Sequence, residues 1–142
     1  MSVNSILEAF QAQHRAVNGV REAPDPKRLP RSLNDDQLPF VLCIPGPAEW
    51  NEQAVGYDRQ NRTVIIRCFV KPVMQGEDIG PALSVVTRLM QAFAETYMDD
   101  WTLGGEVDHI IQPMRDSGLV ALDYAGALYH GFEFQVEVTE KG

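Results

Sequence analysis

Three histidines and a few aspartates are the side chains of this sequence best suited to acid–base chemistry or metal binding. His14, His109 and His130 lie on different predicted elements and do not have the spacing of metal ligands. Asp108 and His109 are neighbours on a predicted strand, so their side chains point to opposite faces and do not share one site. The histidines therefore indicate neither a catalytic pair nor a metal centre.

The remaining aspartates and the absence of enzyme motifs lead to the same expectation. Asp108, Asp116 and Asp123 would form a metal site only if the fold brought them together, and nothing in their spacing demands it. The sequence has no Gly-rich phosphate-binding loop, no HExxH and no GxSxG motif. We therefore expect a protein that is not an enzyme, with no catalytic residue, no metal and no cofactor.

The two cysteines have a structural interpretation. Cys43 and Cys68 both lie inside apolar strand patterns and do not form a CxxC motif. A disulfide is open to them if their strands are neighbours, but a reducing intracellular environment favours free, buried thiols.

The composition limits the kinds of partner. The chain has 142 residues, which fits one domain over residues 1–142, and its 20 acidic and 12 basic residues give a net charge of −8. Such a balance argues against charge-driven wrapping of DNA. No apolar run approaches the roughly 20 residues of a membrane span, and the N-terminus does not resemble a secretory signal.

The elements that must position any site are organised around residues 62–72, the strongest strand pattern in the chain. One face of this strand is apolar, with Val64, Ile66, Cys68 and Val70, and the other mixes apolar and basic side chains. The next helix presents one apolar stripe, formed by Ile79, Leu83, Val86, Met90, Phe93 and Tyr97. A strand followed by a helix with a matching apolar stripe predicts a two-layer α/β arrangement.

The complete order predicts an α+β fold, a mostly antiparallel sheet packed by two helices. An N-terminal helix covers about residues 3–18, with His14 at the edge of its apolar face as a surface or partly buried residue. A proline-rich connector follows over about 22–37, and the α+β core spans about 38–140. We expect strands at 38–45 and 106–112, a turn-rich excursion at 46–53, and hairpins at 55–70 and 119–138. In the last strand Phe132, Phe134, Val136 and Val138 alternate with polar residues, and Gly131 suits a bulge.

Several residues are candidates for contacts with other proteins. The mixed face of the central strand supplies Ile65, Arg67, Phe69 and Lys71, and the two tryptophan loops supply Trp50 and Trp101. Arg59 and Arg62 complete the set. A monomer that buries Ile65 and Phe69 under the N-terminal helix is the alternative. The basic cluster of the connector, Lys27, Arg28 and Arg31, is either a solvated loop or a contact with an acidic partner.

Two stretches carry a resemblance to a known family. The hairpin that ends in Arg62-Thr63-Val64-Ile65-Ile66-Arg67-Cys68-Phe69-Val70 and the helix after it are similar to the central part of phage tail terminator and tail-completion proteins. The end of the chain, from Arg115-Asp116-Ser117-Gly118 through Tyr124-Ala125-Gly126-Ala127-Leu128-Tyr129-His130-Gly131-Phe132 to Val138, resembles their closing hairpin. The size and the opening helix before a proline-rich connector resemble them too.

The resemblance implies a structural protein of the virion, assembled in the host cytoplasm. Such proteins form a ring, usually a hexamer, that caps the head-proximal end of the tail tube and joins it to the neck. The implied partners are other copies of the chain, the tail tube protein and the neck proteins, with DNA as a passing cargo and no membrane. A head–tail adaptor of the same neck is a close alternative. A small-ligand-binding α+β domain is an alternative of another class, and it predicts an aromatic-lined pocket.

Overall fold

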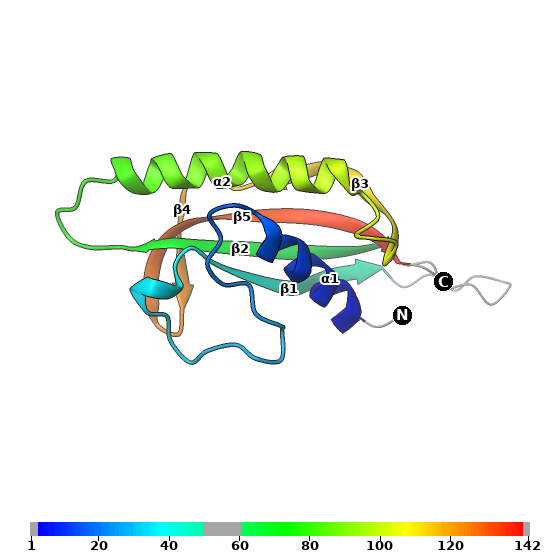
Figure 1. Ribbon diagram of the computed structural model, residues 1–142, viewed down its shortest axis with the longest axis horizontal. Coiled ribbons are helices and arrows are strands. Elements are labelled where there is room, and N and C mark those ends of the chain that lie inside the picture. The colour runs from blue at the N-terminus through cyan, green and yellow to red at the C-terminus, as the bar shows by residue number, and fades with distance from the viewer. Residues whose placement is uncertain (1–2, 50–60, 141–142) are drawn as a thin grey trace, which may run out of the picture.

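The strand that dominates the sequence pattern, β2 (Asn61–Pro72), is paired on both edges, and the other elements are arranged around it. The computed structural model describes residues 3–49 and 61–140. Within these ranges the protein is α+β, as expected, with two α-helices and one sheet of five strands (Figure 1). The other elements are α1 (Val3–Ala16), β1 (Phe40–Glu49), α2 (Gly80–Asp99), β3 (Val107–Asp116), β4 (Val120–Tyr124), β5 (Ala127–Glu140) and a short 3-10 helix, Asp35–Gln37.

The sheet has two long central strands. β5 pairs with β2 in antiparallel register from Asn61 opposite Thr139 to Pro72 opposite Tyr129. β1 pairs with the outer edge of β2, whereas β4 and β3 lie one after the other along the far edge of β5. All strand pairings are antiparallel, so the predicted sheet type is confirmed.

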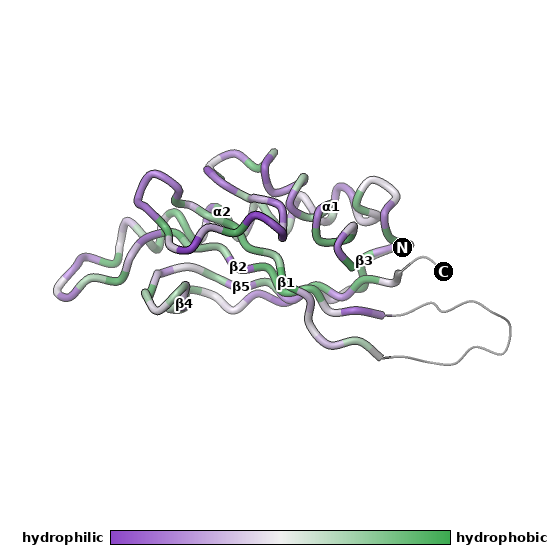
Figure 2. The backbone as a smooth tube through the Cα atoms, turned by 90° about the horizontal axis from the view of Figure 1, so that it is seen from below, coloured by the Kyte–Doolittle hydropathy of each residue, from purple (hydrophilic) through white to green (hydrophobic). Residues whose placement is uncertain are grey.

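The main core lies on one face of this sheet, and both helices cover it (Figure 2). The predicted apolar faces of β2 and β5 are buried there, as are Ile6, Leu7 and Phe10 of α1. The N-terminal helix therefore packs on the same face as α2, and the alternative in which it covers Ile65 and Phe69 is wrong.

The apolar stripe of α2 is rotated from the predicted one at its first turns. Val86, Phe93 and Tyr97 are buried as expected, but Ile79 and Leu83 are 46% and 45% exposed. The buried side runs instead through Ala82 and Leu89. Neither this helix nor α1, the two described, is long and apolar enough to cross a membrane.

A second, smaller core lies on the opposite face at one end of the sheet. Phe69 is fully buried there with Leu38, Phe40, Leu122 and Tyr129. The rings of Tyr124 and Tyr129 meet Phe69 edge-on, with centroids 5.4 and 5.9 Å away. Phe69 therefore packs inside the chain and is removed from the predicted contact residues, because the connector and the β4–β5 hairpin cover it.

Two strand boundaries differ from the prediction. β1 does not turn at Gly46 but continues to Glu49, with a register shift between Pro45 and Ala48 that accommodates two prolines on an edge strand. β3 likewise continues to Asp116 through a shift between Ile111 and Arg115, and the turn falls at Ser117 and Gly118. The strand expected to restart at Val55 and Tyr57 lies outside the described residues.

Gly131 lies opposite a bulge, as its position in the sequence suggested. The register of β2 and β5 shifts between Phe69 and Lys71, and Gly131 is the partner of Phe69. A Cβ at Gly131 would lie 1.9 Å from the carbonyl oxygen of Cys68. The two central strands can approach this closely only because residue 131 has no side chain.

The substitution Gly131→Ala should therefore destabilise the fold by about 3 kcal/mol, because the clash is with backbone at the centre of the sheet. Gly76→Ala is the control, because a Cβ there meets nothing within 4 Å. Only its positive φ of +73° is unfavourable, and the expected loss of stability is about 1 kcal/mol. Chemical denaturation of both variants would measure the difference. Equal losses of stability would contradict the close approach.

Candidate functional site

The three histidines occupy three separate places. His14 is fully buried between α1 and α2, His109 lies near Trp101 with ring centroids 6.3 Å apart, and His130 contacts Glu77. Among residues 3–49 and 61–140, no group of three His, Cys, Asp or Glu side chains could hold a metal ion. The histidines therefore do not form one site in the part of the chain that the structure describes.

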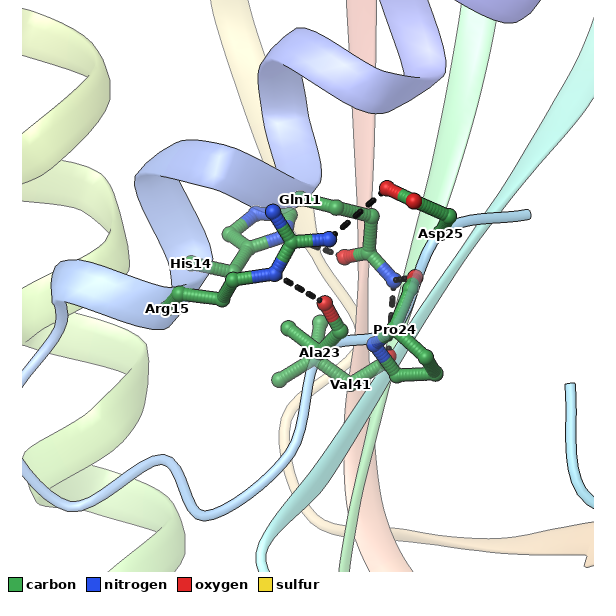
Figure 3. Close-up of polar contacts among 7 residues, drawn as sticks. All are labelled: Gln11, His14, Arg15, Ala23, Pro24, Asp25 and Val41. Carbon is green, nitrogen blue, oxygen red and sulfur yellow. Dashed lines mark hydrogen bonds and ion pairs between the residues drawn. The ribbon is translucent and has the colours of Figure 1, made fainter. Parts of the chain in front are cut away.

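A chain of hydrogen bonds links α1 to the connector and to β1 (Figure 3), and it continues to Tyr97 of α2. The Gln11 amide Nε2 donates to the carbonyl oxygens of Pro24 and Val41, both at 2.9 Å. Both amide hydrogens are then used, so Gln11 Oε1 accepts from His14 Nδ1 at 2.8 Å. His14 Nε2 is left as an acceptor and receives the hydroxyl hydrogen of Tyr97 at 2.5 Å. These contacts specify a neutral His14 that carries its hydrogen on Nδ1.

Burial lowers the pKa of His14 from 6.5 to about 3, and the charge of Arg15 acts in the same direction. The expectation of a surface or partly buried His14 is wrong. His14 follows Phe10 by four residues and Gln11 by three, so it shares their buried side of α1. That spacing was visible in the sequence, but the Tyr97 hydroxyl that satisfies the imidazole was not.

The same side of α1 fixes the start of the connector. Arg15 Nε donates to the carbonyl oxygen of Ala23 at 2.8 Å, and its Nη2 pairs with Asp25 at 2.9 Å (Figure 3). Together with the bond from Gln11 to Pro24, these contacts hold three consecutive connector residues against the helix. The hydrogen bonds therefore serve to place the connector, which is a structural role.

Cys43 and Cys68 are free and buried, as predicted. They lie on neighbouring strands, where Cys43 is opposite Ile66 and Cys68 is opposite Val41. Burial raises the pKa of both thiols far above the usual range. Neither is a reactive nucleophile, because almost no thiolate forms at neutral pH.

Among the predicted contact residues of β2, Ile65 and Arg67 lie on the face away from the helices, whereas Arg62 shares the face of Val64 and lies opposite Val138 of β5. Ile65 is half-buried, Arg62 Nη1 donates to the carbonyl oxygen of Gly46 at 3.3 Å, and Arg67 pairs with Glu133 at 2.9 Å. No described helix covers the central part of the face that carries Ile65 and Arg67. It is thus a sheet surface of mixed apolar and paired charged side chains.

The other predicted contact residues are scattered. Trp101 is 54% exposed in the loop after α2, far along the chain from β2. Lys71 Nζ pairs with Glu77 at 3.4 Å, at the end of β2. Trp50 and Arg59 lie outside the described residues. Of the predicted set, the structure therefore brings together only Ile65 and Arg67 on the open face of β2.

Glu77 organises the loop between β2 and α2. It accepts hydrogen bonds from the Met74 backbone N–H at 3.0 Å and from His130 Nε2 at 2.5 Å, and it pairs with Lys71. The Met74 and His130 hydrogen bonds hold the pKa of the Glu77 carboxyl below its usual range. The loop is therefore tied to both central strands, and its exposed apolar side chains have a defined position.

Exposed large apolar side chains gather at the two ends of α2, and of these the sequence analysis named only Trp101 as a contact residue. One group, which we call the loop patch, surrounds the β2–α2 loop and consists of Val73, Met74, Ile79, Leu83 and Leu128, each at least 40% exposed. Val73 and Leu128 are joined by a backbone hydrogen bond of 3.0 Å. The second group, the tryptophan end, consists of Met98 and Trp101, 60% and 54% exposed. Exposed apolar groups of this kind are typical of protein-interaction surfaces.

The buried imidazole makes stability depend on pH. In the unfolded chain His14 titrates near 6.5, whereas in the folded chain its pKa is about 3. Lowering the pH protonates only the unfolded state, so stability that is present above about pH 6.5 is lost as the pH falls. Between pH 7 and pH 5 this residue should reduce the free energy of unfolding by about 2 kcal/mol.

Denaturation curves at several pH values would measure this slope. His14→Gln should flatten the slope although it lowers stability, whereas Tyr97→Phe should lower stability and keep the slope, because it retains the imidazole. An unchanged slope in His14→Gln would show that His14 is not the group responsible.

No protein-family model matches this chain, and no curated protein matches it. The resemblance to tail terminators therefore depends on the quoted residues and on the order of elements. The function that follows from it is accordingly argued as a proposal.

Proposed function

We propose that this chain is a structural protein of a long-tailed phage virion that caps the head-proximal end of the tail tube as a ring and joins it to the neck. The observation that carries the proposal is the pair of unlike apolar surfaces, the loop patch and the tryptophan end, at opposite ends of α2. They are separated by a helix of 20 residues, about 30 Å long.

Two different surfaces on one chain are what a ring requires. In a head-to-tail assembly each subunit contributes one surface to each neighbour, and the assembly closes if the rotation between subunits closes. Contact of the loop patch with the tryptophan end of the next copy would remove seven exposed apolar side chains from water on every subunit. We take a hexamer as the ring, following the resemblance.

The sheet face that no described helix covers supplies a further surface for the tube or for the neck proteins. It presents Ile65 beside the Arg67–Glu133 ion pair, a mixture suited to a contact that forms after folding. The net charge of −8 suits a ring through which DNA passes without being held. A head–tail adaptor would use the same surfaces, so this alternative belongs to the same class of neck ring.

The mass of the purified protein in solution, measured by light scattering at low and high concentration, tests this proposal. We expect a ring-sized species, either alone or on addition of tail tubes. Met74→Asp and Trp101→Asp should each weaken assembly about tenfold or more, because a charge would have to be buried in the contact. Melting should change little, because both side chains are exposed.

The two variants together test the head-to-tail order. Each retains one intact surface, so a mixture of Met74→Asp and Trp101→Asp should give dimers but no rings. Thr87→Asp, on the exposed side of α2 between the two ends, is the control and should assemble normally. A protein that stays monomeric and does not bind tail tubes would overturn the proposal.

A further inference from the structure

We propose that the groove between α1 and residues 100–106 binds the basic connector segment, Lys27 to Arg31, of a second copy of this chain. The inference deepens the proposed ring and takes from it only the head-to-tail order of the copies. It assigns an occupant to the groove and a partner to the connector.

The groove is open, has a volume of about 610 Å³ and lies at the tryptophan end of the molecule. Its apolar surface comes from Ala9, Ala12 and Ala16 of α1 and from Leu103. The three alanines follow at intervals of three and four residues, so they lie on one face of the helix. Their small side chains leave a hollow that an aliphatic side chain can fill.

The rim of the groove is acidic. Glu8, Asp100 and Glu106 line it, and none of them has an ion-pair partner among residues 3–49 and 61–140. Asp100 accepts hydrogen bonds from Gln13 Nε2 at 3.0 Å, from Thr102 Oγ1 at 3.2 Å and from the Gly104 N–H at 2.9 Å, all of them neutral donors. The groove therefore carries negative charge that no cation of the described residues neutralises, and this charge favours a basic donor group.

The connector segment has the complementary chemistry. Lys27, Arg28 and Arg31 are exposed, and within the described ranges none has an acidic partner. Leu29 lies between them and is 42% exposed. An apolar side chain flanked by three cations matches an apolar hollow with three carboxylates at its rim.

The segment is also held in place on both sides. Before it, Asp25 is paired with Arg15. After it, the hydroxyl of Tyr124 donates to the carbonyl oxygen of Pro30 at 2.5 Å, and that of Tyr129 donates to Leu33 at 3.5 Å. Binding a segment that is already fixed costs less conformational entropy than binding a free one.

The connector faces away from the groove of its own chain. Gln11 and Arg15 of α1 contact the connector, whereas Ala12 and Gln13 line the groove on another side of the helix. In Figure 1 the connector runs on the side of α1 away from α2. The groove is therefore open to a second copy, and the tyrosine contacts place the connector near the β4–β5 hairpin, which carries Leu128 of the loop patch.

Cross-linking between two single-cysteine variants tests the contact whether or not a stable ring forms. A short bis-maleimide should join a Leu29→Cys chain to an Ala12→Cys chain. The yield of this cross-link should be several-fold higher than that of the control pair, Leu29→Cys and Arg88→Cys, in which residue 88 lies on the exposed surface of α2. The native thiols are buried and do not compete.

Charge reversal at Glu8→Lys and Glu106→Lys should reduce both cross-linking and assembly about tenfold. Adding Lys27→Glu and Arg28→Glu in the same chain should restore both.

The outcomes separate this inference from the proposed function. Rings without the cross-link and without an effect of charge reversal would overturn the inference alone. A cross-link in a protein that is otherwise monomeric and ignores tail tubes would support the inference and overturn the ring. Absence of both rings and cross-links would overturn both.

Discussion

The pairing of β2 with β5 is the interaction on which the rest of the structure depends. Each strand has one side that is apolar along most of its length, and the antiparallel register brings both apolar sides onto the same face of the sheet. The strands approach so closely at Gly131 that a single Cβ would meet the backbone of Cys68. Because this is the large continuous apolar face, both described helices pack on it.

One-sided packing decides what the surface can do. Apolar side chains at the first turns of α2, and at and just after its last turn, have no cover within the described chain. Among the described residues, the opposite face of the sheet is covered only at one end, by the connector and the β4–β5 hairpin. The chain therefore presents unlike surfaces in different directions, and this asymmetry supports the proposed ring better than it supports a pocket for a small ligand.

The polar network of α1 links the core to those surfaces. Gln11 and His14 are fully buried, yet each polar atom of their side chains has a hydrogen-bond partner. The other partners are the Tyr97 hydroxyl and two backbone carbonyls. A purely apolar helix would pack on the sheet as well, but it would not position the connector. With Arg15, the network places the basic segment beyond Asp25, away from the acidic groove of the same chain. The two charged surfaces are thereby kept apart and remain open to other molecules.

The sequence alone determined the fold class, the long strand at residues 62–72, the alternation of the last strand and the burial of the two cysteines. These features follow from local spacing, because side chains alternate across a strand and recur every three or four residues along a helix. Only the tertiary structure decided which face α1 covers, that Phe69 belongs to a second core, and that His14 is buried. Each of these depends on residues far apart in the chain, such as Tyr97 beside His14 and Tyr129 beside Phe69. The exposure of Ile79 and Leu83 was hidden for the same reason, since apolar spacing alone does not reveal which turns of a helix are covered.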